Sequence, residues 1–582
     1  MTRSRRAGLV ADGAVVTAYL LTSLWVLSGL VGHLGTRYLA HGVQDQQAFE
    51  WYLGASAHNV LTTSNPLFSD RQNFPDGVNL MANAAVIGLG IPLTPVTDLL
   101  GAQRSFFLVT WLGLAGTAAA WYWLFRRRLG VGRVPAALGG WLTGFAPGMV
   151  AHANGHLNFV AAALVPLLVD RVVRLHEDGR PWRDGLVLGL LAAWQVLIGE
   201  EVLLLAALGG GVVLLVLLAS GRVRLRALLP GLAVGAGVSI ALVAVPLWWQ
   251  FAGPQSYTSL WHPPGGNDLA ALWGRATRTV GADPWASAAL SMNRTEENAF
   301  FGVPLLVAAA LVVVALWRRP LVRALAVLVV LACWASLGEE VLLRGEKVPV
   351  PSLWALLDGV PVLGNVLPTR FALVAVPPLA ALLALGVHAA GQVPLARQGA
   401  LSRRWVQVAS GWAAAAAAVL ALLPLVPTPL VTAERPLVPA FFATGAWRGF
   451  VDDGSVLAVP PTDIVDARAF DWQRVARMGF PIVEGYFVGP TGQADGGGRY
   501  GAPRRPFSLW LYAVAAEGTP RTATAQERAL FVADLRAWRT DVLVLPRRPD
   551  AAVLLASVRS VLGEPRVVED VWLWDVRALQ RR

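Results

Sequence analysis

The sequence predicts a mainly α-helical membrane protein that ends in a small α/β domain. Hydrophobic residues make up 55% of the 582 residues, and charged residues only 15%. A soluble chain of this length needs more charge to cover its surface, so the composition indicates a polytopic membrane protein. The net charge is +11, and the arginines fall in clusters between apolar runs. This clustering favours membrane orientation over nucleic-acid binding.

The transmembrane part is predicted from runs of apolar residues, because a spanning helix takes about 20 of them. Eleven runs qualify, near residues 12–33, 105–125, 135–151, 157–172, 184–199, 202–219, 227–251, 301–317, 321–337, 371–389 and 406–427. The first run follows RSRR and is interpreted as a retained span, since no convincing cleavage site follows it. The single cysteine, Cys333, lies inside an apolar run, which excludes disulfides and CxxC sites.

Arginine clusters give the expected orientation. With a cytoplasmic N-terminus, eleven spans place six clusters inside, near residues 3–6, 126–133, 171–183, 222–226, 318–323 and 397–404. A twelfth candidate, 82–101, contains two prolines and an acid. Counting it as a full crossing would put the next five clusters on the wrong side. We therefore expect 82–101 to be a re-entrant or juxtamembrane segment whose backbone is covered by protein or water.

The extracytoplasmic side then holds the chemically unusual segments. They are the long first outer loop (34–104), the stretches 252–300 and 338–370, and everything from residue 429. In that last region, expected strands alternate with expected helices. The strands are 454–460, 540–546 and 566–576, and the helices are 525–539 and 550–563. We expect a transmembrane domain over 1–428 and an extracytoplasmic α/β domain over 429–582 of a multi-pass cell-membrane protein.

Four stretches resemble a known family. They are QDQQAFEWYLGASAHNVLTTSNPLFSDRQNFPDGVNL after the first span, GFAPGMVAHANGHLN after the third, NVLPTRFALV before the tenth, and WQRVARMGFPIVEGYFVGP near the C-terminus. With the topology, they make the chain similar to the GT-C superfamily of integral membrane glycosyltransferases, particularly to actinobacterial polytopic members. The resemblance implies a GT-C helix bundle and a polyprenyl-phosphate-linked sugar as donor. It also implies transfer on the extracytoplasmic face to a cell-envelope glycan, lipid or protein.

The sequence departs from this family in its acids. Such enzymes often carry two adjacent acids in the first loop, whereas Asp45 is followed by two glutamines and the next acid is Glu50. The second-loop acids of the metal-dependent branch are replaced by His156 and Asn158. We therefore expect no metal site, with a divalent metal as the alternative, and no other cofactor.

Asp45 is the candidate catalytic residue. Glycosyl transfer to a hydroxyl needs a base for the acceptor proton and stabilisation of the departing phosphate. Asp45 is expected to be the general base of an inverting transfer. The alternative is a helix N-cap, which favours Asp, although Ala48 provides no capping box. Glu50 is a candidate for substrate contact, but a solvated or structural acid is the favoured interpretation.

Arg370 is the candidate for binding the donor phosphate. It lies in LPTRF at the outer end of a span, against the positive-inside trend. Arginine suits bidentate binding of phosphate. The alternative is an interfacial arginine that extends to the lipid headgroups.

Other polar residues at the outer ends of spans are candidates for substrate contact: His152, His156, Asn158, Glu200 and Glu201. Two histidines four residues apart could share a metal, but no carboxylate is near them in sequence. A hydrogen-bonding rim for sugar or phosphate is favoured over a metal site, and a structural polar turn is the alternative. The adjacent glutamates suggest function, because acids at membrane depth are costly. At a helix boundary they could instead reach water.

Two other classes of protein are alternatives to the transferase. One is a transporter or flippase with a regulatory outer domain, and the other is an envelope scaffold without chemistry. Transporters tend to show repeated halves and buried charges near the bilayer midplane. The sequence has no evident repeat, and its unusual polar groups lie at outer helix ends, which favours the transferase.

Overall fold

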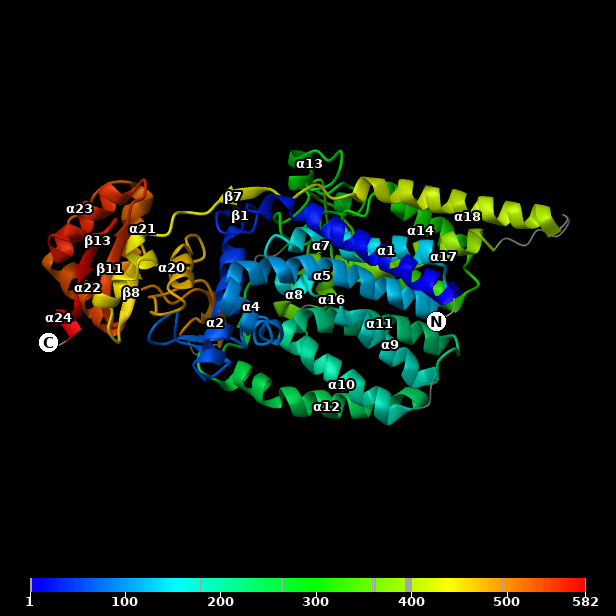
Figure 1. Cartoon of the computed structure of the whole chain (residues 1–582), viewed down its shortest axis with the longest axis horizontal. Coiled ribbons are helices and arrows are strands. Elements are labelled where there is room, and N and C mark those ends of the chain that lie inside the picture. Colours follow the sequence, from blue (N-terminus) through cyan, green and yellow to red (C-terminus); the bar gives the residue numbers. More distant parts are fainter. Residues whose placement is uncertain are drawn as a thin grey trace. The chain divides into compact units, whose positions relative to one another are not determined.

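The computed structural model describes residues 3–177, 180–262, 265–357, 360, 363–392, 400–493 and 496–580, with side chains at 3–5 and 400–406 excepted (Figure 1). Parts of the predicted arginine clusters at 3–6 and 397–404 therefore lie outside the described residues. The chain forms two compact units, each of which is described by itself. The first comprises Met1–Gly42, Phe107–Val243 and His262–Ala433, and the second Val43–Phe106, Ala244–Trp261 and Glu434–Arg582.

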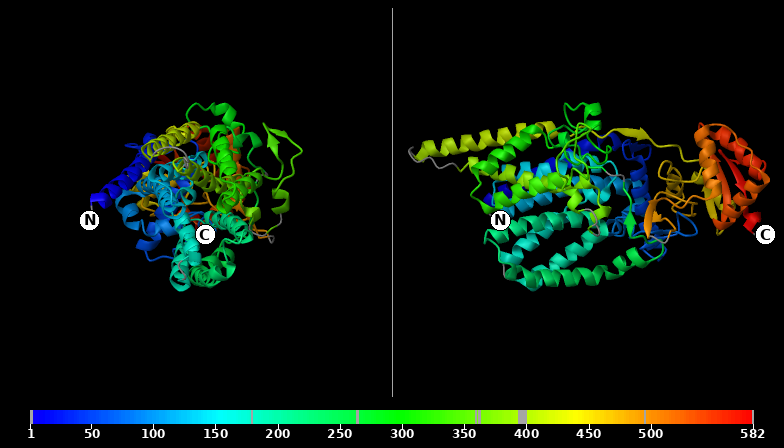
Figure 2. Two further views of the ribbon diagram at one scale, coloured as in Figure 1. Left: turned by 90° about the vertical axis from the view of Figure 1, so that its right-hand side faces the viewer. Right: turned by 180° about the vertical axis from the view of Figure 1, so that it is seen from behind.

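The first unit is built from helices, and most of the long ones run side by side in all views (Figures 1 and 2). They are α1 (Arg3–Val26), α5 (Ala102–Leu124), α6 (Arg133–Phe145), α7 (Pro147–His152), α8 (Leu157–Val160), α9 (Leu164–Glu177), α10 (Pro181–Ile198), α11 (Glu200–Ala219), α12 (Leu225–Ala252), α13 (Pro284–Ala288), α14 (Val303–Ala315), α15 (Pro320–Ala335), α16 (Trp354–Leu357), α17 (Phe371–Ala390) and α18 (Ala400–Leu422). Short strands accompany them: β1 (Arg37–Leu39), β5 (Leu342–Leu343), β6 (Glu346–Lys347) and β7 (Thr432–Glu434).

Six helices in the described part of the chain are long and apolar enough to cross a membrane. They cover Arg6–Val26, Ala102–Leu129, Glu200–Ala219, Leu225–Ala252, Pro368–Ala390 and Gln407–Leu425. A multi-pass membrane protein follows from these helices. Helices α14 and α15 are apolar but shorter, so the count of eleven spans stays a prediction.

Two predicted spans are interrupted, and the interruptions bring polar residues to helix ends. The run 135–151 divides between α6 and α7, because Ala146 takes an extended conformation and Pro147 begins the next helix. The run 157–172 divides between α8 and α9. Backbone N–H and C=O groups that are not bonded within a helix are tolerated at membrane depth only where protein or water provides their hydrogen bonds. Most residues around these two breaks are buried within the protein.

The second unit contains the first-loop helix α2 (Val43–Leu61) together with the C-terminal region. Segment 82–101 forms two short helices here, α3 (Ile87–Gly90) and α4 (Thr94–Leu100), rather than one long helix. The other helices are α19 (Ala440–Ala443), α20 (Ala469–Val475), α21 (Pro506–Glu517), α22 (Ala525–Ala537), α23 (Ala551–Leu562) and α24 (Arg577–Gln580).

The C-terminal region forms a mixed four-stranded sheet, in the order β12 (Arg566–Val568), β13 (Val571–Asp575), β11 (Thr540–Pro546) and β8 (Ser455–Ala458). Strand β11 is parallel to β8 and antiparallel to β13. All seven residues of β11 are buried, as expected for a central strand covered on both faces. Its hydrophobic core includes Phe507, Leu511 and Phe531 from helices α21 and α22. The predicted strands 454–460 and 540–546 and the predicted helices 525–539 and 550–563 form close to their expected positions. The stretch 566–576 was predicted as one strand, but it turns back on itself and forms the antiparallel pair β12 and β13. The extracytoplasmic placement of this region stays a prediction.

A second, three-stranded sheet joins distant segments of the chain, in the order β4 (Ser259–Leu260), β10 (Gly497–Tyr500) and β9 (Val488–Pro490). Strand β10 is antiparallel to β9 and parallel to β4. A short hairpin of β2 (Phe68–Ser69) and β3 (Val78–Asn79) completes the strands of this unit among the described residues. The three-stranded sheet matters for the site, because it fixes the segment that contacts Asp45.

Candidate active site

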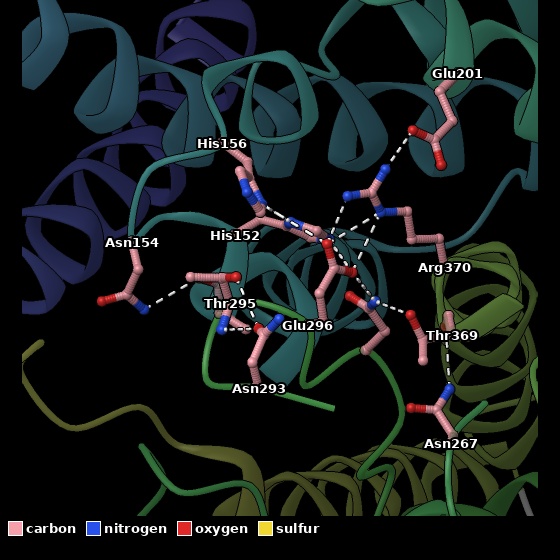
Figure 3. A network of polar contacts seen from close by, with 12 residues as sticks. His152, Asn154, His156, Glu201, Asn267, Asn293, Thr295, Glu296, Thr369 and Arg370 are labelled. Carbon is pink, nitrogen blue, oxygen red and sulfur yellow. Dashed lines mark hydrogen bonds and ion pairs between the residues drawn. The ribbon is translucent and has the colours of Figure 1, made fainter. Parts of the chain in front are cut away.

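An ionic cluster lies at the ends of helices in the first unit, with Arg370 at its centre (Figure 3). The Nη1 atom of Arg370 lies 2.5 Å from Oε2 of Glu201. Its Nη2 atom lies 2.6 Å from Oε1 of Glu296. The arginine also donates from Nε to Glu296, at 3.1 and 3.2 Å to the two oxygens. One guanidinium therefore bridges two carboxylates, one from the first turn of α11 and the other from the loop before α14.

Two histidines flank Glu296 on the other side (Figure 3). The Nδ1 atoms of His152 and His156 share a hydrogen bond of 2.7 Å. Glu296 Oε2 lies 3.9 Å from His152 Nε2, and Oε1 lies 4.0 Å from His156 Nδ1. The His152 ring stacks on Phe159 at 4.2 Å between centroids, and Arg370 lies over the same phenyl ring. Phe159 thus forms an apolar wall under the cluster.

Neighbouring amides hold Glu296 and Arg370 in place. Asn298 donates to Glu296 Oε2 at 2.7 Å and to the Thr369 hydroxyl at 3.3 Å. Asn267 donates to the Thr369 carbonyl at 3.0 Å. Because Thr369 precedes Arg370 in the turn that begins α17, these bonds fix the base of the arginine side chain. The loop that carries Glu296 is thereby attached to the start of a span.

Electrostatics keep the carboxylate charged and the buried histidine neutral. Burial acts to raise the pKa of Glu296, but the positive charge of Arg370 outweighs burial, and the pKa lies below its ordinary value. Burial lowers the pKa of His152 to about 3, against the opposing effect of Glu296. A neutral imidazole offers a lone pair, which is the form that binds metal ions or accepts hydrogen bonds.

The cluster has the donor chemistry of a divalent-cation site. One ligand atom from each of His152, His156 and Glu296 lies within 4.8 Å of the others. One buried acceptor of the cluster, Glu201 Oε1, has no hydrogen-bond partner among the described residues. A close set of two imidazoles and one ionised carboxylate fits a cation.

The structure therefore removes the reason for expecting no metal. The two histidines have no carboxylate near them in sequence, but the fold brings Glu296 to them from a distant loop. Sequence reasoning missed Glu296 and Asn298. The two adjacent glutamates of RTEENAF, in a loop predicted to be extracytoplasmic, could have indicated a functional acid there.

The remaining predicted residues of this region differ in their surroundings. Asn158 is buried, and its Oδ1 has no hydrogen-bond partner. Glu200 begins helix α11 and is half-buried beside Glu201. Arg370 pairs with protein carboxylates, so the alternative of an arginine extending to lipid headgroups is wrong.

Asp45 lies in the second unit, inside the first turn of α2. Because the helix begins at Val43, Asp45 is its third residue and not the N-cap, which corrects that alternative. Its Oδ1 accepts a hydrogen bond of 2.7 Å from the Tyr486 hydroxyl. Asp45 is only partly buried. A partly exposed carboxylate can be reached by a hydroxyl group from solvent.

Glu50, one turn and a half further along α2, has a different environment. It is 4% exposed and accepts from Arg435 at 2.8 Å and from Gln46 at 2.8 Å. Arg435 also bonds Asp471 of α20 at 3.1 Å. Glu50 is therefore buried rather than solvated, and it attaches α2 to the C-terminal region. Its proposed contact with substrate has no support from this geometry.

Comparisons with known proteins bear on the fold. No family model and no curated protein matches the chain. Solved structures do match. The arabinofuranosyltransferase AftD from Mycobacteria shares 14% identity at a TM-score of 0.55, with 97% of this chain and 40% of AftD covered.

Two structures of the Archaeoglobus fulgidus oligosaccharyltransferase also match, with lower scores. The apo form shares 11% identity at a TM-score of 0.48, covering 92% of this chain and 69% of that chain. AglB in complex with an inhibitory peptide and a dolichol-phosphate shares 10% identity at 0.47, covering 95% and 71%.

The match to AftD defines the class of fold. AftD is an arabinofuranosyltransferase, and its structural similarity extends over nearly all of this chain. The chain has the GT-C fold, as the sequence analysis predicts. It spans about 40% of the length of AftD.

Proposed function

We propose that the chain is a membrane glycosyltransferase that uses a polyprenyl-phosphate-linked sugar. It would transfer the sugar on the extracytoplasmic face to a cell-envelope glycan, lipid or protein, with inversion at the anomeric carbon. The observation that carries the proposal is the position of Asp45. In a GT-C fold, this carboxylate begins the helix after the first span and is held by a hydrogen bond from Tyr486.

In the proposed reaction, Asp45 acts as general base. Its carboxylate takes the proton of the acceptor hydroxyl while the hydroxyl oxygen attacks the anomeric carbon. A new carbon–oxygen bond forms on one face of the sugar. The bond to the carrier phosphate breaks on the other face, and the lipid phosphate leaves with the electron pair. Attack from the opposite face gives the inverted product.

Arg370 is proposed to bind the carrier phosphate. A guanidinium has five N–H donors in a planar fork, which matches phosphate oxygens. Glu201 and Glu296 presently neutralise Arg370, so an incoming phosphate must compete with a carboxylate. His152, His156 and Glu296 would hold a divalent cation, which supplies the positive charge that attracts a phosphate to such a site. Asn158 and Glu200 are proposed as substrate contacts at the same helix ends.

The test replaces Asp45 with asparagine. Membranes carrying the wild-type chain or Asp45→Asn are supplied with a series of radiolabelled polyprenyl-phosphate sugars, and label transferred to envelope material is counted. Loss of a general base lowers such rates by about a hundredfold or more. Asp70→Asn is the matched control, because Asp70 lies in the same outer loop and its side chain is 47% exposed.

Three results have different meanings. Transfer by the wild type and by Asp70→Asn, with loss in Asp45→Asn, supports the proposal. Full activity of Asp45→Asn overturns the role of Asp45. No transfer by the wild type with any donor of the series overturns the proposed function and favours the transporter or the scaffold.

A further inference from the structure

Tyr486 is the feature from which a further inference follows. It lies 441 residues after Asp45, and its hydroxyl donates to Asp45 Oδ1 at 2.7 Å. The carboxylate of an aspartate has two equivalent oxygens and can rotate about the Cβ–Cγ bond. A donor fixed on one oxygen sets the direction of the other. The contact therefore orients the group that is proposed to take the acceptor proton.

The backbone around Tyr486 is fixed on its C-terminal side. The amide of Val488 donates to Asn83 Oδ1 at 2.7 Å, and the Asn83 amide donates back to the Val488 carbonyl at 2.9 Å. The Phe487 carbonyl accepts from Gly501 at 2.7 Å. Val488 is also the partner of Tyr500 in the pairing of β9 with β10. A side chain on so constrained a segment can position another group within a fraction of an ångström.

The same asparagine ties this segment to the Asp45 helix. Tyr52 lies seven residues after Asp45 on α2, two turns along the same face. Its hydroxyl donates to Asn83 Oδ1 at 3.1 Å. Tyr257, from the segment before β4, bonds the neighbouring Ala82 carbonyl. Helix α2 and the Tyr486 segment thus share one anchor, so the separation of Asp45 from Tyr486 is set by the fold.

The electrostatic environment keeps the Tyr486 hydroxyl protonated. Burial raises the pKa of Tyr486 well above its ordinary value, and the Asp45 charge raises it further. The phenol is therefore a donor at all physiological pH values. Donation to the charged form of a carboxylate favours that form, which is the form a general base needs.

We propose that Tyr486 is a positioning residue for the transfer reaction, which holds Asp45 ionised and aims its second oxygen at the acceptor hydroxyl. The proposal rests on the proposed function and deepens it. Tyr486 keeps its own proton throughout, and the acceptor proton goes to Asp45. The C-terminal region thereby acts on the reaction indirectly, through the bond from the Tyr486 hydroxyl to Asp45.

The test compares two tyrosine-to-phenylalanine variants in the labelled-transfer assay, with initial rates measured from pH 5 to 9. Tyr486→Phe removes the bond to Asp45. Tyr512→Phe is the control, because its hydroxyl donates to the Pro461 carbonyl at 2.8 Å in the same unit and does not bond Asp45. For Tyr486→Phe we expect kcat to fall about tenfold, since bonds to charged groups contribute about 1.5 kcal/mol or more.

The pH profile separates positioning from a loss of folded protein. Without the Tyr486 hydroxyl, the Asp45 carboxylate is harder to ionise, so the acidic limb of the Tyr486→Phe profile moves to higher pH. The KM for the polyprenyl-phosphate sugar is unchanged. A smaller amount of folded protein would scale the profile without moving it. Tyr512→Phe should give the wild-type profile.

The outcomes distinguish this proposal from the proposed function. If the wild type transfers sugar and Asp45→Asn does not, but the kcat and acidic limb of Tyr486→Phe match the wild type, the positioning role is overturned and the function stands. If the wild type transfers nothing with any donor, both are overturned.

Discussion

Asp45 and Glu50 show how two acids on one helix acquire different roles. Asp45 is partly exposed and bonded to a tyrosine hydroxyl, whereas Glu50 is buried against Arg435. Their side chains leave α2 on different faces, because five residues correspond to about 500° of rotation. The number of residues between Asp45 and Glu50 is enough to place the two acids on different faces of the helix. The sequence analysis could not find the partners, which lie 441 and 385 residues away.

The ion pair of Glu50 with Arg435 gives a prediction about stability. Glu50→Gln leaves a buried guanidinium with one of its two carboxylates removed, and breaking such a pair costs about 3 kcal/mol. The free energy of unfolding of the purified protein, measured by denaturant titration, should fall by this amount. Glu340→Gln is the control, because Glu340 and its partner Lys347 are 61% and 67% exposed and such pairs contribute about 0–1 kcal/mol. Equal effects of the two variants would contradict the structural role of Glu50.

At the scale of elements, two small-residue faces explain how helices α10 and α12 pack. A Cβ atom added to Gly185 would lie 2.5 Å from the Gly231 carbonyl oxygen, and one added to Gly189 would lie 2.6 Å from that of Gly235. The backbones approach so closely only because both sides lack side chains. Helices in membranes associate through such packing, since lipid removes most of the hydrophobic driving force between them.

Alanine substitutions test this packing. Gly189→Ala places a methyl group against a backbone oxygen, so we expect the thermal unfolding temperature to fall by several degrees. Gly237→Ala, also in α12, meets nothing within 4 Å; it should leave the unfolding temperature unchanged or raise it, since alanine is favoured over glycine in helices by about 1 kcal/mol. A stabilised Gly189→Ala variant would show that the helices are further apart than in the structure.

The same scale shows what the sequence could and could not predict. Hydropathy located the apolar helices, and the alternation of strands with helices located β8 and β11 but joined β12 and β13 into one strand. The breaks at Ala146 and between α8 and α9 were not predicted, because the apolar runs continue through them. In the ionic cluster, Arg370 contacts Glu296 and Glu201, which lie 74 and 169 residues away in the sequence. Hydropathy does not predict contacts between distant residues. Arg370 was identified from its position at the end of a span, whereas its partner Glu296 was not identified.

At the scale of the whole molecule, the orientation in the membrane is the main prediction that remains open to test. Arginine clusters place the turn between α11 and α12 inside and the stretch 252–300 outside. The single cysteine, Cys333, allows a simple background, because Cys333→Ala yields a chain without cysteine.

Single cysteines then report the side of the membrane. Trp285 lies in α13 and is 87% exposed, and Arg222 lies exposed in the turn after α11. We expect a membrane-impermeant maleimide to label Trp285→Cys in intact cells. Arg222→Cys should react only after the cells are opened. The reverse labelling pattern would invert the orientation and place the proposed site on the cytoplasmic side.

The bond from Tyr486 to Asp45 has a consequence for biosynthesis. Helix α2 is made early, yet its partners Arg435, Gln473 and Tyr486 follow it by 385, 422 and 441 residues. Chains still on the ribosome therefore carry the proposed base without the groups that hold it. If Tyr486 raises kcat about tenfold, as proposed, nascent chains and chains truncated before residue 486 transfer sugar at no more than about a tenth of the full rate, and full activity begins only when synthesis is nearly finished.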